Sequence, residues 1–315
     1  MPYNLRGRNV LIVGGSRGLG AVVAEKFAVE GCNLAINYLF SQEQADNLAS
    51  ELAKKYSIKA VTIQGDAGLA QDCVRLVQST IEKLNGLDII ISNAGWTKFT
   101  SFGDLDALTD EEWDKCWATN VKSNLVLFKE AAPTFNANSE GGVFIATSSI
   151  AGITAAGSSM AYSVTKSAGL HLLQCLKASQ GPKVRINAIL PGLLLTEWGV
   201  RYSSEQIAAW KDKSTLKHEV FLDDCADMYV SLSKNTSMTG QQIVIGDHRD
   251  LQHDLVLVMS YVLGLFQVYS GCFYAKDTLS DLFSTDPWFK REQSRYRATK
   301  TPKATPQARP NNDSK

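Results

Sequence analysis

The sequence lacks the cysteine and histidine spacings that metal sites and disulfide frameworks require. Its six cysteines are dispersed, with no Cys-x-x-Cys pair: Cys32, Cys73, Cys116, Cys175, Cys225 and Cys272. The four histidines show no metal-ligand spacing either: His171, His218, His248 and His253. This pattern argues against a zinc site or a disulfide-stapled secreted domain and fits a reducing compartment. We therefore expect no metal, and we interpret Cys116 and Cys175 as core residues of helices.

The chain also lacks an excess of charge of one sign and an amino-terminal leader. Thirty-two basic residues balance thirty-two acidic ones, so no net field draws the whole protein to nucleic acid. The first apolar run, Val10–Val13, is too short for the core of a signal peptide. With 44% hydrophobic and 20% charged residues among 315, the composition is that of a packed globular protein. We expect a soluble cytoplasmic protein with no nucleic-acid partner.

Short β-branched runs alternate with longer helical patterns from residue 9 to about residue 245. The expected strands are Val10–Val13, Leu34–Tyr38, Val61–Ile63, Leu87–Ile91, Val143–Ala146, Val184–Ile189 and Ile243–Ile245. Such alternation indicates right-handed crossovers and a parallel sheet covered on both faces. The pattern predicts one doubly wound α/β domain over residues 1–248. Thr109 followed by Glu112 predicts a capping box that opens a long helix running toward Pro133.

The sequence changes character after Gly246. Residues 255–275 contain no charge, and residues 290–315 carry eight basic residues against two acidic ones. We expect an apolar extension over residues 249–275 and a basic, disordered tail over residues 276–315. The uncharged stretch is long enough to cross a membrane, but we favour a non-spanning extension over an anchor. A departure from the true reading frame after Gly246 is a third explanation.

A glycine-rich turn follows the first expected strand and opens a helix. It supplies six candidate cofactor-binding residues: Gly14, Ser16, Arg17, Gly18, Leu19 and Gly20. Its glycines let the backbone turn tightly and approach a pyrophosphate at the helix amino terminus. The turn therefore predicts a dinucleotide site.

The second expected strand ends without the carboxylate that would bind a free ribose 2′-hydroxyl. No acidic residue follows until Glu43, whereas NAD-binding folds place Asp or Glu at this point. Arg17 can meet a 2′-phosphate instead, and Ser41 can add a hydroxyl; the alternative is that Arg17 faces solvent. We expect NADP(H) to be preferred.

Two polar sites follow the next expected strands. Asp66 comes after the third strand, and Asn93 and Gly95 come after the fourth. Open α/β sheets bind ligands at the carboxyl ends of their strands. Asp66 can accept a hydrogen bond from the adenine amino group, and Asn93 can stabilise the central sheet beside the cofactor, although either residue alone would be an ordinary turn former.

The strongest signal is Tyr162 followed four residues later by Lys166. Residues at this spacing share one helix face. A lysine ammonium beside a phenol lowers a phenol pKa that is ordinarily about 10. Ser149 follows the fifth expected strand, where its hydroxyl could hold a substrate carbonyl oxygen beside the tyrosine.

Together these motifs resemble the short-chain dehydrogenase/reductase superfamily, over about residues 5–246. The resemblance implies a Rossmann domain with a catalytic tetrad of Asn120, Ser149, Tyr162 and Lys166. By this resemblance Tyr162 is the catalytic acid/base. Lys166 would bind the nicotinamide ribose and lower the pKa of the tyrosine. Ser149 would orient the substrate, and Asn120 would hold a water in a proton relay.

The resemblance extends to the segment after the sixth expected strand. Leu194 and Thr196 match residues that contact the nicotinamide carboxamide, and residues 197–217 match a variable substrate-covering segment that reads as polar, helical and mobile. Trp96 and Trp198 each follow a cofactor-contacting segment, and we leave open whether they wall a pocket or fill the core.

The family commonly forms homo-oligomers through the helices that would carry Asn120 and Tyr162. An apolar stripe of Leu170, Leu173 and Leu176 fits such a contact, although a buried helix would need it equally. Residues 246–248 depart from the family's closing Asp-Gly-Gly.

The sequence as a whole predicts an NADPH-dependent reductase that converts a small-molecule ketone into a secondary alcohol, or catalyses the reverse. The alternative is a catalytically impaired cofactor-binding protein with a sensing or interaction role. Such a protein would be expected to lose Tyr162 or Lys166, and this chain keeps both.

Overall fold

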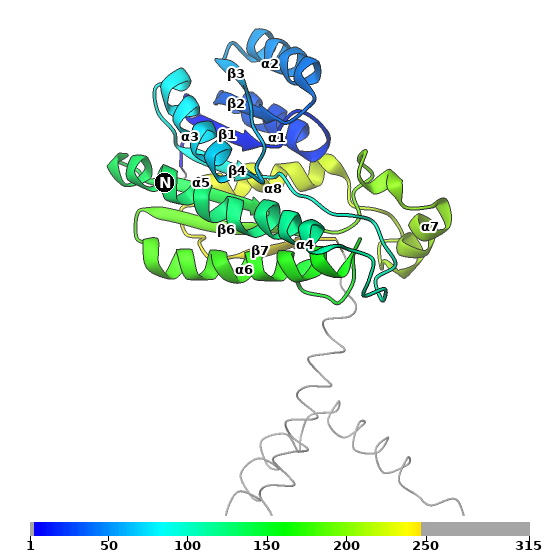
Figure 1. The fold of residues 1–315 in the computed structure, drawn as a ribbon. Coiled ribbons are helices and arrows are strands. Elements are labelled where there is room, and N and C mark those ends of the chain that lie inside the picture. The colour runs from blue at the N-terminus through cyan, green and yellow to red at the C-terminus, as the bar shows by residue number, and fades with distance from the viewer. Residues whose placement is uncertain (1–2, 247–315) are drawn as a thin grey trace, which may run out of the picture. The chain divides into compact units, whose positions relative to one another are not determined.

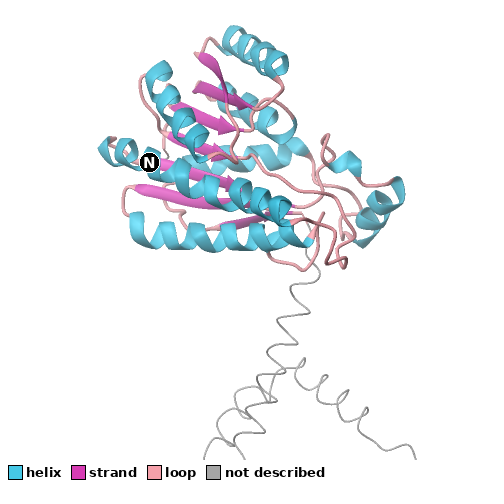
Figure 2. Ribbon diagram, viewed as in Figure 1, coloured by secondary structure: helices cyan, strands magenta, loops and turns pink. Residues whose placement is uncertain are grey.

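A computed structural model describes residues 3–246, which form a seven-stranded sheet between two layers of helices (Figures 1 and 2). The strand order is β3-β2-β1-β4-β5-β6-β7, and every neighbouring pair is parallel. The strands are β1 (Asn9–Val13), β2 (Asn33–Tyr38), β3 (Ala60–Gln64), β4 (Ile89–Ser92), β5 (Gly142–Thr147), β6 (Val184–Pro191) and β7 (Gln242–Ile245). All seven expected strands are present, and the doubly wound Rossmann fold is confirmed.

The fourth strand begins two residues later than its apolar run predicts. Leu87 is buried, but its carbonyl accepts a hydrogen bond from Asn138 Nδ2 at 2.9 Å. The backbone of the next residue, Asp88, already bonds to both neighbouring strands: its amide donates to the Asn9 carbonyl at 2.9 Å and its carbonyl accepts from the Val143 amide at 3.0 Å. The strand itself runs from Ile89 to Ser92.

The helices cover both faces of the sheet. Their bounds are α1 (Gly18–Val29), α2 (Gln42–Tyr56), α3 (Ala70–Leu84), α4 (Asp110–Trp117), the π-helical turn η1 (Ala118–Lys122), α5 (Ser123–Ala137), the 3-10 turn η2 (Ile150–Gly152), α6 (Met160–Gln180), the 3-10 turn η3 (Gly199–Arg201), α7 (Ser204–Lys213) and α8 (Leu222–Lys234). Alternate residues of β1 enter different cores: Val10 and Ile12 pack in a cluster with α1 and α8, whereas Leu11 and Val13 pack with α3, α5 and α6. This period of two is what a strand buried on both faces requires.

The predicted capping box opens α4. Thr109 Oγ1 accepts a hydrogen bond from the Glu112 amide at 3.3 Å, and the Glu112 carboxylate accepts one from the Thr109 amide at 3.0 Å. The helical path continues through η1 and beyond Pro133 to Ala137. Phe135, fully buried, supports this last turn.

Two expectations about α6 change in the structure. Cys116 is buried as expected, but Cys175 is exposed, so its assignment to the core is wrong. Leu170, Leu173 and Leu176 are buried in the core of their own domain. The stripe therefore carries no argument for a contact between copies of the chain.

The remaining structural expectations concern metals, membranes and the carboxyl-terminal region. Within residues 3–246, no cluster of histidine, cysteine and carboxylate side chains could hold a metal ion, and no helix is long and apolar enough to span a membrane. His171 and His218 are exposed. The predicted extension (249–275), the predicted tail (276–315), His248, His253 and Cys272 lie outside the described residues, so the domain division stays a prediction.

Candidate active site

A cavity of about 710 Å³ lies where the carboxyl ends of several strands meet. Segments that follow β1, β2, β3, β4, β5 and β6 all line it. Strands β1 and β4 are neighbours in the sheet although two strands separate them in sequence, which makes this the switch point where such folds bind ligands. The cavity is lined by eleven of the twelve predicted cofactor-binding residues that lie outside the tetrad: Gly14, Ser16, Arg17, Gly18, Leu19, Ser41, Asp66, Asn93, Gly95, Leu194 and Thr196.

The glycine loop has the shape that close approach of a dinucleotide requires. Gly14 and Gly18 have φ angles of +71° and +54°, which favour glycine. Gly20 does not line the cavity; a Cβ there would overlap the Gly14 carbonyl oxygen and lie 2.8 Å from Asn93 Nδ2. Arg17 occupies the N-cap of α1 without a capping side-chain bond in the described structure, so amide groups of the first turn can meet phosphate oxygens.

Asn37 braces this loop, a role that the sequence analysis missed. Its Oδ1 accepts a hydrogen bond from the Gly14 amide at 2.9 Å, and its Nδ2 donates to the carbonyls of Ile63 at 3.1 Å and Gly65 at 3.0 Å. The side chain is 2% exposed. Its position at the end of β2 follows the rule that placed Asp66 and Asn93, so the signal was present.

Arg17, Ser41 and Asp66, the three residues predicted to hold the adenosine of the cofactor, all line the cavity. Ser41 occupies the N-cap position of α2, and Asp66 accepts a hydrogen bond from the Gly68 amide at 2.8 Å. Arg17 forms an ion pair with Glu197, and both residues line the cavity. This partner was not anticipated, because Glu197 is 180 residues away in sequence.

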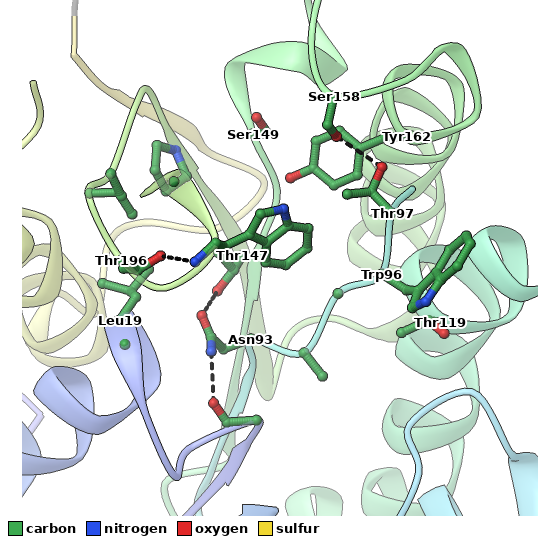
Figure 3. A pocket seen from close by; sticks show the side chains of 18 of the residues that line it. Leu19, Asn93, Trp96, Thr97, Thr119, Thr147, Ser149, Ser158, Tyr162 and Thr196 are labelled. Atoms are coloured by element: carbon green, nitrogen blue, oxygen red, sulfur yellow. Dashed lines mark hydrogen bonds between the residues drawn. The ribbon is translucent and has the colours of Figure 1, made fainter. Parts of the chain in front are cut away.

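Asn93 connects the glycine loop to the middle of the sheet, as expected. Its Nδ2 donates to the Gly14 carbonyl at 3.0 Å, and its Oδ1 accepts from Thr147 Oγ1 at 3.1 Å (Figure 3). Thr147 is also 2.7 Å from the Tyr229 hydroxyl, and its carbonyl accepts from Lys166 Nζ at 2.8 Å. Thr147 closes β5 two residues before Ser149, and sequence reasoning missed it.

Ser149 and Tyr162 lie side by side in the cavity lining (Figure 3). Ser149 caps η2 by accepting from the Ala151 amide at 3.1 Å. Ser159 caps α6 by accepting from the Tyr162 amide at 3.2 Å. Ser163 Oγ donates to the Ala151 carbonyl at 2.7 Å, and this bond joins the two caps into one rigid unit.

Burial controls the protonation of the Tyr162–Lys166 pair. Burial raises the pKa of Tyr162 well above its ordinary value, and the hydrogen bond with Ser149 offsets part of that rise. Burial lowers the pKa of Lys166 to about 8. The lowering of the tyrosine pKa by Lys166 stays a prediction: burial has the larger effect here, while Lys166 Nζ bonds to the Thr147 carbonyl and lies 5.4 Å from the Tyr162 ring centroid. Tyr162 is therefore a neutral proton donor at neutral pH.

Asn120 lies in η1 and does not line the cavity. Its Oδ1 accepts from the Trp96 amide at 2.9 Å, while its Nδ2 donates to the Trp96 carbonyl and to Thr165 Oγ1, both at 3.0 Å. Its own carbonyl accepts from Asn124 Nδ2 at 2.9 Å. Asn120 thus clamps the backbone of a cavity-lining residue, and its role in holding a relay water stays a prediction.

The structure also identifies lining residues that no motif singled out. Trp96 and Trp198 both line the cavity, which answers the question of wall or core. Residues 197–217 are helical over η3 and α7, and they contribute Tyr202 and Trp210 to the lining. Figure 1 shows α7 beyond the strand ends. These two aromatics carry no spacing signal, because only the folding of the segment over the cavity gives them a role.

Comparison with known proteins agrees with this geometry. The family model for short chain dehydrogenases matches residues 8–206. A protein of Streptomyces violaceoruber, named as ketoacyl reductase 2 of the granaticin polyketide synthase, is 31% identical over 237 residues, which cover 75% of this chain and 93% of that protein.

Two solved structures share the fold. NADPH-dependent 3-quinuclidinone reductase from Rhodotorula rubra aligns with a TM-score of 0.71 and 27% identity, over 77% of this chain and 91% of that one. A short-chain dehydrogenase from Burkholderia cenocepacia, solved in complex with NADP, aligns with a TM-score of 0.71 and 27% identity, over 78% of this chain and 98% of that one.

The chain belongs to the short-chain dehydrogenase/reductase family. The protein is accordingly an oxidoreductase that acts on CH–OH groups of a small-molecule substrate with a nicotinamide cofactor.

The packing around Gly20 generates a first prediction. In Gly20→Ala, the new Cβ forces the Gly14 carbonyl and Asn93 apart, so we expect a loss of about 1–3 kcal/mol in unfolding free energy together with weaker dinucleotide binding. Urea denaturation and NADPH fluorescence titration measure the two effects. Gly103→Ala is the matched control, because a Cβ at Gly103 has no neighbour within 4 Å among the described residues. Unchanged cofactor affinity in Gly20→Ala would contradict the assignment of the glycine loop as the dinucleotide-binding site.

The buried ammonium of Lys166 generates a second prediction, on stability. Its pKa lies near 8 in the folded chain and near 10.5 when unfolded, so the unfolded chain binds more protons between these values. The destabilisation by the buried charge is therefore full below pH 8 and is relieved as pH rises. Relative to Lys166→Met, the wild-type unfolding free energy should rise by about 2 kcal/mol from about pH 7 to about pH 9.5. If the difference in unfolding free energy between wild type and Lys166→Met does not change with pH, the pKa of Lys166 is not shifted by folding.

Proposed function

We propose that the protein is an NADPH-dependent reductase that converts a ketone into a secondary alcohol, and that it catalyses the reverse oxidation when cofactor ratio and pH favour it. The observation that carries this proposal is that Ser149, Tyr162 and Lys166 line one cavity, with the hydroxyls of Ser149 and Tyr162 side by side and Lys166 almost fully buried (Figure 3). Two of the relatives named above are reductases of carbonyl groups by name, and one is a complex with NADP, which supports the same reading.

The residues of the cavity fit a phosphorylated dinucleotide. The glycine loop and the amino terminus of α1 bind the pyrophosphate, Asp66 accepts from the adenine amino group, and Leu194 and Thr196 contact the nicotinamide end. Arg17 and Ser41 bind the 2′-phosphate, since β2 ends without a carboxylate. When bound, the dinucleotide supplies the hydride.

The side chains of this chain handle the carbonyl oxygen and the proton. Ser149 donates a hydrogen bond that orients the oxygen toward the phenol. Tyr162 donates its proton to that oxygen as negative charge develops there, and its raised pKa ensures that the proton is present. Lys166, held by the Thr147 carbonyl, places positive charge beside the phenolate that remains.

We further propose that copies of the chain assemble into a homo-oligomer in the cytoplasm. This proposal rests on the family resemblance, because the apolar stripe of α6 is used within the domain. Membrane association through the region beyond Gly246 stays the disfavoured alternative.

The proposed proton transfer predicts a selective loss in Tyr162→Phe. The variant keeps the ring but lacks the transferable proton, so ketone turnover should fall by about 100-fold or more while NADPH still binds. Lys166→Ala should weaken both turnover and binding, because it removes charge and a ribose contact together. The control is Tyr56→Phe, which removes a hydroxyl bonded to Glu25, a residue that does not line the cavity. If Tyr162→Phe keeps most of the activity, Tyr162 is not the proton donor.

The cofactor assignment predicts a difference between NADPH and NADH. Arg17→Ala should cost NADPH about 1.5–3 kcal/mol of binding free energy, the worth of a charge-assisted phosphate contact, and should cost NADH little. Glu197→Gln frees Arg17 from its ion pair and should tighten NADPH without changing NADH. Fluorescence titration with both cofactors checks each variant. If Arg17→Ala loses equal binding free energy for NADPH and NADH, Arg17 does not bind the 2′-phosphate.

A further inference from the structure

Aromatic side chains line the cavity that contains Ser149 and Tyr162. Three of the chain's six tryptophans are among them, namely Trp96, Trp198 and Trp210, together with Tyr202. Trp198 packs against Tyr162, and we call these two rings, with Tyr202, the substrate lobe. The chemistry at Tyr162 needs only a carbonyl oxygen, so these rings are free to recognise the rest of the substrate.

Trp198 is the ring nearest to the proposed chemistry. Its centroid lies 5.9 Å from that of Tyr162, with the ring planes at 62°. On its other side, its Cη2 lies 3.3 Å from the position that a Cβ at Gly95 would occupy. The indole therefore reaches across the cavity, from the segment after β6 to the segment after β4, directly beside the phenol.

The polar side chains of the substrate lobe are engaged with the protein. Ser158 Oγ donates to Thr97 Oγ1 at 2.8 Å. Thr154 Oγ1 donates to the Ile150 carbonyl at 3.0 Å. These bonds commit the hydroxyl protons of Ser158 and Thr154, whereas the hydroxyls of Ser149 and Tyr162 face the cavity.

The ring of Tyr202 is also held by packing. It lies edge-to-face on Phe99 with a centroid distance of 5.0 Å. A ring fixed in this way loses little conformational entropy when a substrate packs on it.

We propose that this lobe selects ketones fused to a planar aromatic ring, and that Trp198 determines the selectivity. The inference rests on the ketone reduction proposed above. An aromatic substrate ring gains edge-to-face or offset contacts with indole and phenol beyond the burial of its area. A saturated ring on the same carbon skeleton buries similar area but has no π face, so it lacks these contacts.

The test compares two ketones that share one skeleton, 2-tetralone and trans-2-decalone. With NADPH, wild-type kcat/KM should favour 2-tetralone by about fivefold or more. Trp198→Leu keeps an apolar side chain but removes the π face, so the ratio of the two kcat/KM values should fall toward one. The matched control is Trp117→Leu, because Trp117 is 47% exposed and does not line the cavity; this variant should keep the wild-type ratio.

A binding measurement separates this inference from the proposed reaction. The two ketones are titrated calorimetrically into enzyme saturated with NADP⁺, where no hydride is available. Tighter binding of 2-tetralone in the wild type, lost in Trp198→Leu, supports the lobe assignment even if neither ketone is turned over with NADPH, and that lack of turnover would count against the reductase proposal. Equal binding and equal kcat/KM for the two ketones in the wild type, or a preference that survives in Trp198→Leu, overturns the inference.

Discussion

The side chain of Asn93 ties the cofactor loop to the wall that carries the candidate catalytic residues. It bonds to the Gly14 carbonyl on one side and to Thr147 on the other, and the Thr147 carbonyl in turn holds the ammonium of Lys166. A buried polar group that loses its partner costs about 1–3 kcal/mol, so each bond stabilises the placement of the next. The glycine turn, the central strand ends and Lys166 consequently hold one arrangement, and the position of Tyr162 on the same helix follows from it.

The parts of this arrangement that local patterns encode could be predicted from the sequence. β-branched runs located all seven strands, and the Thr109–Glu112 box located the start of α4. Helical phase would also have placed Cys175 correctly, since it lies two residues from the buried Leu173 and so on another side of α6. The π turn at Asn120 carries no such signal, because bonds to Trp96 and Thr165, which are distant in sequence, accompany it.

The electrostatics of the Tyr162–Lys166 pair show a second limit of local patterns. A spacing of four residues correctly places the two on one face of α6, but it contains nothing about burial, which is a tertiary property. Lys166 is 5% exposed and bonds to a strand-end carbonyl. Desolvation therefore dominates both groups, raising the pKa of the phenol and lowering that of the ammonium. The result is a protonated tyrosine, which suits proton donation to a ketone.

The segment after β6 links the two ends of the cavity through adjacent residues. Glu197 pairs with Arg17 at the adenosine end, while Trp198 packs against Tyr162 in the substrate lobe. The Trp198 amide donates to Thr196 Oγ1 at 3.3 Å, so Thr196, Glu197 and Trp198 occupy a single tight turn. Because backbone shifts in such a turn are shared, the Glu197 carboxylate that pairs with Arg17 and the indole beside Tyr162 are positioned by the same stretch of backbone. If Arg17 binds the 2′-phosphate as proposed, cofactor choice and substrate shape are coupled in this chain by three consecutive residues, none of which is a member of the tetrad.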